Sequence, residues 1–234
     1  MKLKKIASLM LAGVMAVSML AGCSGKTETK PEGEGNGDGT TASGYSAKLE
    51  SYLSDEVKDM ENVSFQDDAK QATALESAVK NISAAEVVKT AKENAVPNSI
   101  EDWDSPDYAK MIAELKKAYD VQDDDLQAAD MNLLWAVNEQ YKANRSLNDA
   151  VVYAVTGSVD LDKALKQVAD KLNGYFEQLP ASGEVNNGKG TNPALVYDYD
   201  YTISVSVVNK PVTVFTEYDG SVNYIAVTVS RTIA

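Results

Sequence analysis

Apolar residues recur at helical spacing through most of the chain between residues 46 and 179. Leu49, Leu53 and Val57 begin the pattern. Spacings of three and four residues place side chains on one face of a helix, so each apolar stripe predicts an amphipathic helix. We expect six or seven helices in this part of the chain. Their stripes cover residues 49–60, 72–82, 87–95, 108–119, 126–141, 147–155 and 161–179.

Capping signals mark where several of these helices should begin. Ser83 is followed three residues later by Glu86, which is the capping-box pattern. Ser105 precedes Pro106, and proline favours the first helical position. Asp160 is expected to cap the last helix, while the short helix predicted over 147–155 should end at Gly157.

The period changes to two after a polar loop at residues 181–193. Apolar and polar residues alternate from 195 to 208, and two further strands are predicted over 212–218 and 222–233. Turns are expected at 209–211 and at Asp219-Gly220. The sequence therefore predicts one α+β domain over 46–234, with helices at 46–179 and a three-stranded antiparallel sheet at 194–233 packed on them. Two subdomains hinged near 181–193 are the alternative.

The first 45 residues read as an export signal and a tether. A basic start and an apolar run from Ile6 to Leu20 precede Cys23, and the run is too short to span a bilayer. Leu20-Ala21-Gly22-Cys23 resembles the lipobox of bacterial lipoproteins. The resemblance implies a signal peptide at 1–22, a diacylglyceryl anchor on Cys23 and a place on the extracytoplasmic face of the cell membrane. An ordinary signal cut near Ala21 is the alternative. Residues 23–45 are polar and Gly-rich, which predicts a disordered tether.

Composition excludes several classes of function. The chain has 22 basic and 35 acidic residues, a net charge of −13, which argues against binding nucleic acid. It contains no histidine and one cysteine, so catalytic triads and histidine-ligated metals are excluded. Phosphate-binding glycine loops and the common catalytic motifs are absent as well. We therefore predict a protein that is not an enzyme and has no cofactor or metal.

Aromatic residues are the candidate binding residues. Tyr197, Tyr199 and Tyr201 line one face of the first predicted strand and could stack on a sugar ring or hold a peptide. The competing interpretation, which we favour, packs this face under the helices, because Ile203 and the apolar residues after it continue the same face. Trp103 lies in an acidic loop, where it either covers the core edge or meets a ligand.

Acidic residues offer weaker candidates. Asp198 and Asp200 share the other face of the same strand, where paired carboxylates could bind Ca²⁺ or act as acid and base. On a solvent-facing strand such residues more commonly only solvate the surface. The acidic run at 120–125 lacks the order of a calcium-binding loop and is expected to start a helix.

Residues 147–173 resemble the closing helix pair of extracellular solute-binding lipoproteins of ABC importers. The resemblance is carried by Leu147–Gly157 and by Val159–Lys166. The whole chain looks more like small surface lipoproteins of Gram-positive anaerobes, which implies a location and no activity. We therefore expect an anchored module that binds an extracellular glycan, peptide or protein. The alternatives are a reduced solute-binding component of an importer and an enzyme built on Asp198 and Asp200.

Overall fold

A six-stranded mixed sheet forms the centre of the protein, with strand order β1-β5-β6-β3-β2 and β4 paired to β5. The computed structural model describes residues 44–101, 104–121, 144–185, 194–214 and 218–234. Only β1 and β5 are parallel, and the other pairs are antiparallel. The elements are α1 (Tyr45–Tyr52), α2 (Asp55–Lys58), β1 (Val63–Phe65), α3 (Ala69–Lys80), α4 (Ala84–Glu93), β2 (Asn98–Ser99), α5 (Pro106–Ala118), β3 (Leu147–Thr156), α7 (Leu161–Phe176), β4 (Ser182–Val185), β5 (Leu195–Val214) and β6 (Tyr218–Ile233).

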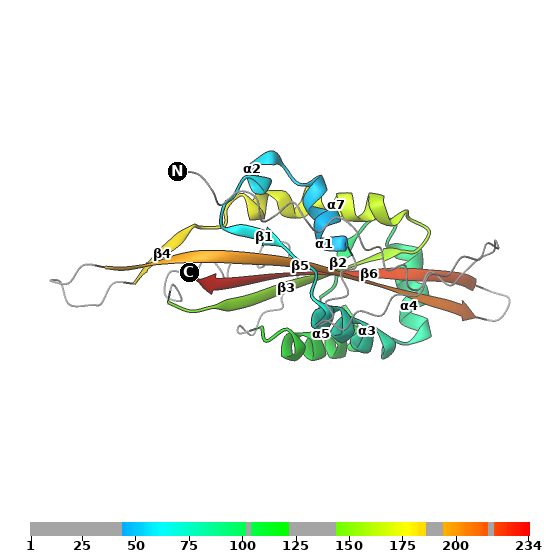
Figure 1. The fold of residues 1–234 in the computed structure, drawn as a ribbon. Coiled ribbons are helices and arrows are strands. Elements are labelled where there is room, and N and C mark those ends of the chain that lie inside the picture. The colour runs from blue at the N-terminus through cyan, green and yellow to red at the C-terminus, as the bar shows by residue number, and fades with distance from the viewer. Residues whose placement is uncertain (1–43, 102–103, 122–143, 186–193, 215–217) are drawn as a thin grey trace, which may run out of the picture.

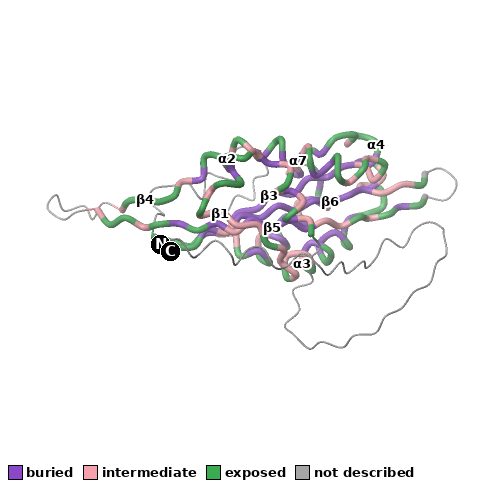
Figure 2. The backbone as a smooth tube through the Cα atoms, turned by 45° about the horizontal axis from the view of Figure 1, so that its top comes forward, coloured by how far each residue is buried: buried purple, intermediate pink, exposed green. Residues whose placement is uncertain are grey.

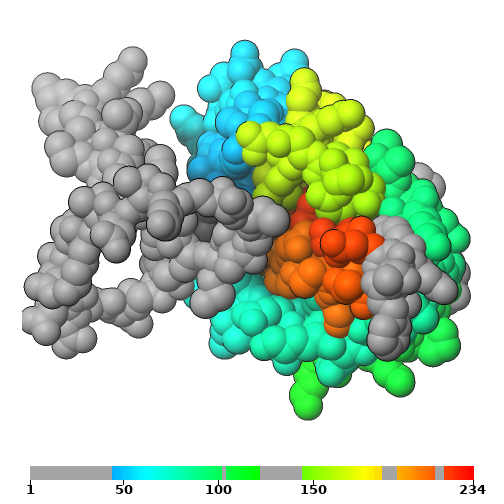
Figure 3. Space-filling model, turned by 90° about the vertical axis from the view of Figure 1, so that its right-hand side faces the viewer, coloured from blue at the N-terminus to red at the C-terminus, as the bar shows by residue number. Residues whose placement is uncertain are grey.

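Helices cover both faces of the sheet, so the molecule has three layers (Figure 1). The first core packs α1, α2 and α7 on one face, and the second packs α3, α4 and α5 on the other. Figure 2 shows the buried strands running between the two helical layers. Figure 3 views the molecule from the right-hand side of Figure 1, where β5 and β6 lie between the two helical layers. Because both faces are covered, β3 and the middle of β6 contribute apolar residues to both cores.

The predicted fold class is wrong in its topology. The sheet has six strands rather than three, it is mixed rather than antiparallel, and strands alternate with helices along the chain. Three of the missed strands, β1, β2 and β4, have only two to four residues each. Such segments are too short to display a period of two, so only pairing with the long strands β3 and β5 defines them.

The predicted helix over 147–155 is the central strand β3. Of its residues only Asn148 and Thr156 are not buried. The strand lies between β6 and β2, and its two faces contribute to the two different cores. A continuous apolar run fits a helix and a strand buried on both faces equally well. Its β-branched and aromatic residues, Val151 to Val155, favour the strand. The first helix of the pair that suggested solute-binding lipoproteins therefore does not exist.

The turns predicted at 209–211 and at Asp219-Gly220 are also wrong, because β5 continues unbroken to Val214 and Asp219-Gly220 lies within β6, paired with β5. Pro211 pairs with Ser221 of β6, and its nitrogen faces the side of β5 away from β6, where no donor is required. The neighbouring Lys210 ammonium donates to the carbonyl oxygens of Val79 at 2.7 Å, Lys80 at 2.9 Å and Ile82 at 2.7 Å. These bonds fasten the C-terminal end of α3 to the sheet.

The predicted helix starts are confirmed at three places. The Ser83 hydroxyl accepts from the Glu86 N–H at 3.3 Å and caps α4. The Ser105 hydroxyl accepts from the Tyr108 N–H at 3.2 Å, with Pro106 at the first position of α5. An Asp160 carboxylate oxygen accepts from the Lys163 N–H at 3.1 Å and caps α7. These bonds join residues three apart, so local sequence is sufficient to specify them.

Candidate functional site

The tyrosines singled out from the sequence lie at one end of the first core. Tyr199 is 3 % exposed and Tyr201 1 %, whereas Tyr197 is half-buried at the edge of that core. The Tyr201 hydroxyl donates to the Pro180 carbonyl at 2.9 Å. Packing is thus the role that the structure gives Tyr199 and Tyr201, and Tyr197 alone retains a surface for a ligand. Cys23 and Trp103 lie outside the described residues.

Two charged residues that the sequence did not single out are buried beside these tyrosines. Arg231 of β6 is 1 % exposed and Asp149 of β3 is 2 % exposed. The Arg231 guanidinium stacks on the Tyr199 ring at 4.3 Å from its centroid and donates to the Arg145 carbonyl at 3.1 Å. Strand register places Asp149 opposite Val229, one diagonal step from Arg231 on the same face. No local pattern distinguishes these residues from surface charges, so only the sheet register reveals them.

Buried phenols provide a first prediction, on alkaline stability. Burial raises the pKa of Tyr119, Tyr201 and Tyr224. Phenols of the unfolded chain ionise near pH 10, so above about pH 10 the unfolded state binds fewer protons than the folded state. The stability that these buried phenols contribute to the folded protein is fully present below about pH 10 and is lost as the pH rises further. Tyrosinate absorbance should therefore appear in two phases, the second coinciding with loss of circular dichroism.

Replacing Tyr119 or Tyr201 with Phe is the control for this titration, since each change should remove part of the second phase. A single ionisation of all twelve tyrosines near pH 10 in a folded protein would contradict the prediction.

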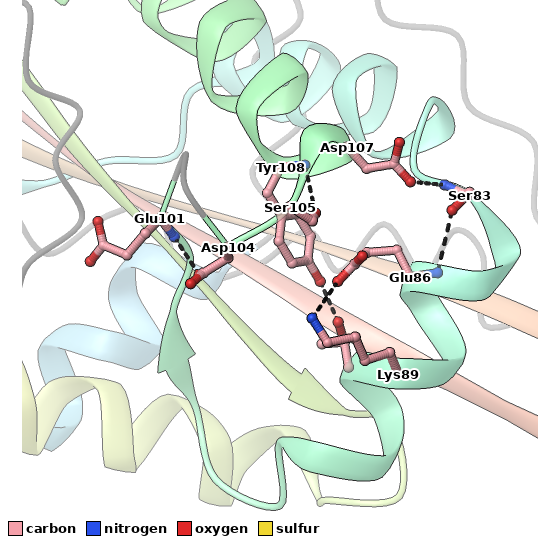
Figure 4. Close-up of polar contacts among 9 residues, drawn as sticks. Ser83, Glu86, Lys89, Glu101, Asp104, Ser105, Asp107 and Tyr108 are labelled. Carbon is pink, nitrogen blue, oxygen red and sulfur yellow. Dashed lines mark hydrogen bonds and ion pairs between the residues drawn. The ribbon is translucent and has the colours of Figure 1, made fainter.

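A second polar cluster joins the starts of α4 and α5 (Figure 4). The Ser83 N–H donates to an Asp107 carboxylate oxygen at 2.9 Å, and hydrogen bonds from Ser83 lower the pKa of Asp107. The hydroxyls of Thr90 and Tyr108 are hydrogen-bonded to each other inside the second core. Acidic residues near a helix start are stabilised by the helix dipole, so a structural role accounts for the cluster. In the described part of the chain, no group of acidic residues and cysteines could hold a metal ion.

The feature best placed for contact with a partner is a two-stranded ribbon, formed by residues 182–185 of β4 and 195–198 of β5. It extends past the helices at one end of the sheet (Figures 1 and 2). Four large apolar side chains of the described residues are exposed, and three of them lie on or beside the ribbon. They are Leu195 at 48 %, Val196 at 57 % and Ile233 at 37 %. Leu195 and Ile233 share one face of the sheet, and exposed apolar side chains that share a face are typical of an interaction site.

The two faces of the ribbon differ in chemistry. Leu195 pairs with Val185, and Ile233 pairs with Tyr199, so these residues continue the face that the first core covers. Val185 and Tyr197 pack against the edge of that core. The opposite face carries exposed Glu184, Asp198 and Asp200, together with Val196. Asp198 and Asp200 are therefore adjacent, as predicted, but face solvent on a strand.

The sequence contains a partial signal for this site. Tyr197 and its neighbour Asp198 were visible as members of the two faces of a strand. The partner strand β4 falls in a segment expected to be a loop, so the ribbon itself was missed. Exposure of Leu195 could not be predicted, because the same alternation continues into the buried part of β5.

Comparisons with known proteins assign no family to the chain. Within the described residues, no helix has both the length and the apolar content needed to cross a bilayer. Searches of protein-family models, of curated proteins and of solved structures found no match for this chain.

Proposed function

We propose that the protein is a lipid-anchored extracytoplasmic module that binds a partner protein through the β4–β5 ribbon. The observation that carries the proposal is the extension of an apolar core face beyond its helical cover, with Leu195 48 % exposed and Ile233 37 % exposed. Leaving apolar area in water is unfavourable by about 25 cal/mol per Å², so a contact that covers this face is stabilising.

The anchor rests on the sequence. The lipobox around Cys23 is followed by a polar segment that ends where α1 begins at Tyr45. A diacylglyceryl group holds a protein stably at a membrane, whereas a single acyl chain does not. The acidic surface, with a net charge of −13, favours a protein partner over an anionic lipid surface. The importer alternative no longer has the helix pair that suggested it. Asp198 and Asp200 are exposed on their strand, where carboxylates more commonly only solvate the surface.

Photo-crosslinking in the native host tests the proposal. A photoreactive residue at Leu195 should crosslink to one partner, whereas the same residue at exposed Asp170 on α7 should give no discrete product. In parallel, metabolic labelling with a fatty acid should modify the full chain and should be lost in Cys23→Ala. Absence of a crosslink at Leu195 would overturn the ribbon as a contact site. Absence of labelling would overturn the anchor.

A further inference from the structure

One edge of the ribbon has backbone groups directed away from β5. The Tyr199 N–H donates to the Ala181 carbonyl at 2.9 Å. The backbone groups of successive strand residues point toward opposite edges of the strand. Because residue 181 bonds to β5, residues 183 and 185 also direct their backbone groups toward β5. Ser182 and Glu184 therefore direct theirs outward. In the described residues, β4 pairs with β5 and with no other strand. An edge of this kind is a template for adding another strand.

Side chains beside this edge specify what an added strand should carry. Positions of the incoming strand that lie opposite Gly183 and Val185 project onto the apolar face, beside Leu195 and Tyr197. Positions opposite Ser182 and Glu184 project onto the acidic face, beside Asp198. Apolar and basic residues in alternation would satisfy both faces.

We propose that the outer edge of β4 binds an extended segment of the partner protein in which apolar and basic residues alternate. The inference rests on the proposed function and adds the chemistry of the partner. Main-chain hydrogen bonds from Ser182 and Glu184 supply affinity, and the two faces supply specificity. A second copy of this chain fits less well, because pairing of two β4 edges would bring two Glu184 carboxylates together.

The test uses synthetic peptides of about six residues, the usual length of a strand, and the full-length protein. An alternating Val/Lys peptide should bind in fluorescence anisotropy, and an alternating Val/Glu peptide should not. A peptide of the same Val and Lys content arranged in two blocks controls for simple charge attraction to an acidic protein. Methylation of the amide nitrogens along one edge of the Val/Lys peptide should abolish binding, since those amides can no longer donate to β4.

Matched variants of the protein locate the site. Glu184→Lys should weaken Val/Lys binding about fivefold or more, corresponding to about 1 kcal/mol for one cross-strand charge pair. Asp170→Lys makes the same charge change on exposed α7 and should leave affinity unchanged. Circular dichroism verifies that both variants fold.

Two outcomes would overturn strand addition: equal binding of the blocked or methylated peptides, and equal affinity of Glu184→Lys and wild type. If the Val/Lys peptide fails while Leu195 still crosslinks in cells, this inference falls and the proposed function stands. If the Leu195 crosslink is absent, the proposed function falls.

Discussion

Replacing Arg231 with Ala should lower the free energy of unfolding by about 3–5 kcal/mol, which is the usual cost of removing one member of a buried charged group. Arg231 is 1 % exposed, and its guanidinium stacks on Tyr199 and donates to the Arg145 carbonyl. The variant leaves a cavity and removes the cation nearest in register to the buried Asp149. Urea denaturation followed by circular dichroism measures the loss.

The matched control is Arg145→Ala. Its side chain is exposed, and the substitution retains the carbonyl that Arg231 uses, so stability should change by less than about 0.5 kcal/mol. The double variant Arg231→Met with Asp149→Leu should recover much of the loss, because apolar residues of similar volume can replace two buried charged residues at little cost. A loss below about 1 kcal/mol in Arg231→Ala would contradict the structural role.

Tyr201→Ala should destabilise the protein by about 3–5 kcal/mol, as truncation of a buried aromatic residue does. The ring is 1 % exposed in the first core, and its hydroxyl donates to the Pro180 carbonyl. Tyr201→Phe retains the ring and should cost about 1 kcal/mol for the lost hydrogen bond. Thermal and urea unfolding of the three proteins measures the difference.

Tyr197→Ala is the comparison that separates packing from binding. Tyr197 is half-buried on the ribbon, so its truncation should cost less stability than that of Tyr201 while weakening crosslinking at Leu195. If Tyr201→Ala is as stable as wild type, the tyrosine face is not part of the core. That result would instead favour the hypothesis that Tyr197, Tyr199 and Tyr201 form a face that binds a ligand.

Some of the fold follows from short-range chemistry. The caps at Ser83, Ser105 and Asp160 join a side chain to a backbone N–H three residues away, and all three are found in the structure. The alternation of residues 195–208 likewise identified a strand, because one of its faces is apolar over most of that length. Neither inference depends on which strands pair with the segment or which helices pack on it.

Other parts of the fold depend on contacts that are distant in sequence. Leu147–Thr156 is a strand because β6 and β2 pair with its two edges and helices cover both its faces. A run that is apolar on every side carries no period to reveal this. Pro211 was expected to end a strand, but its position on an open edge makes it compatible with one.

For the candidate site, the sequence alone established the absence of histidine and the two chemically different faces of the strand that begins at Leu195, while the lipobox at residues 20–23 stays a prediction. Only the tertiary structure decided that Tyr201 and Arg231 lie inside the core while Leu195 lies outside it. The reason is that burial depends on where the helical layers end over the sheet. Pattern along a strand records which residues share a face, and packing between layers determines how much of that face is covered.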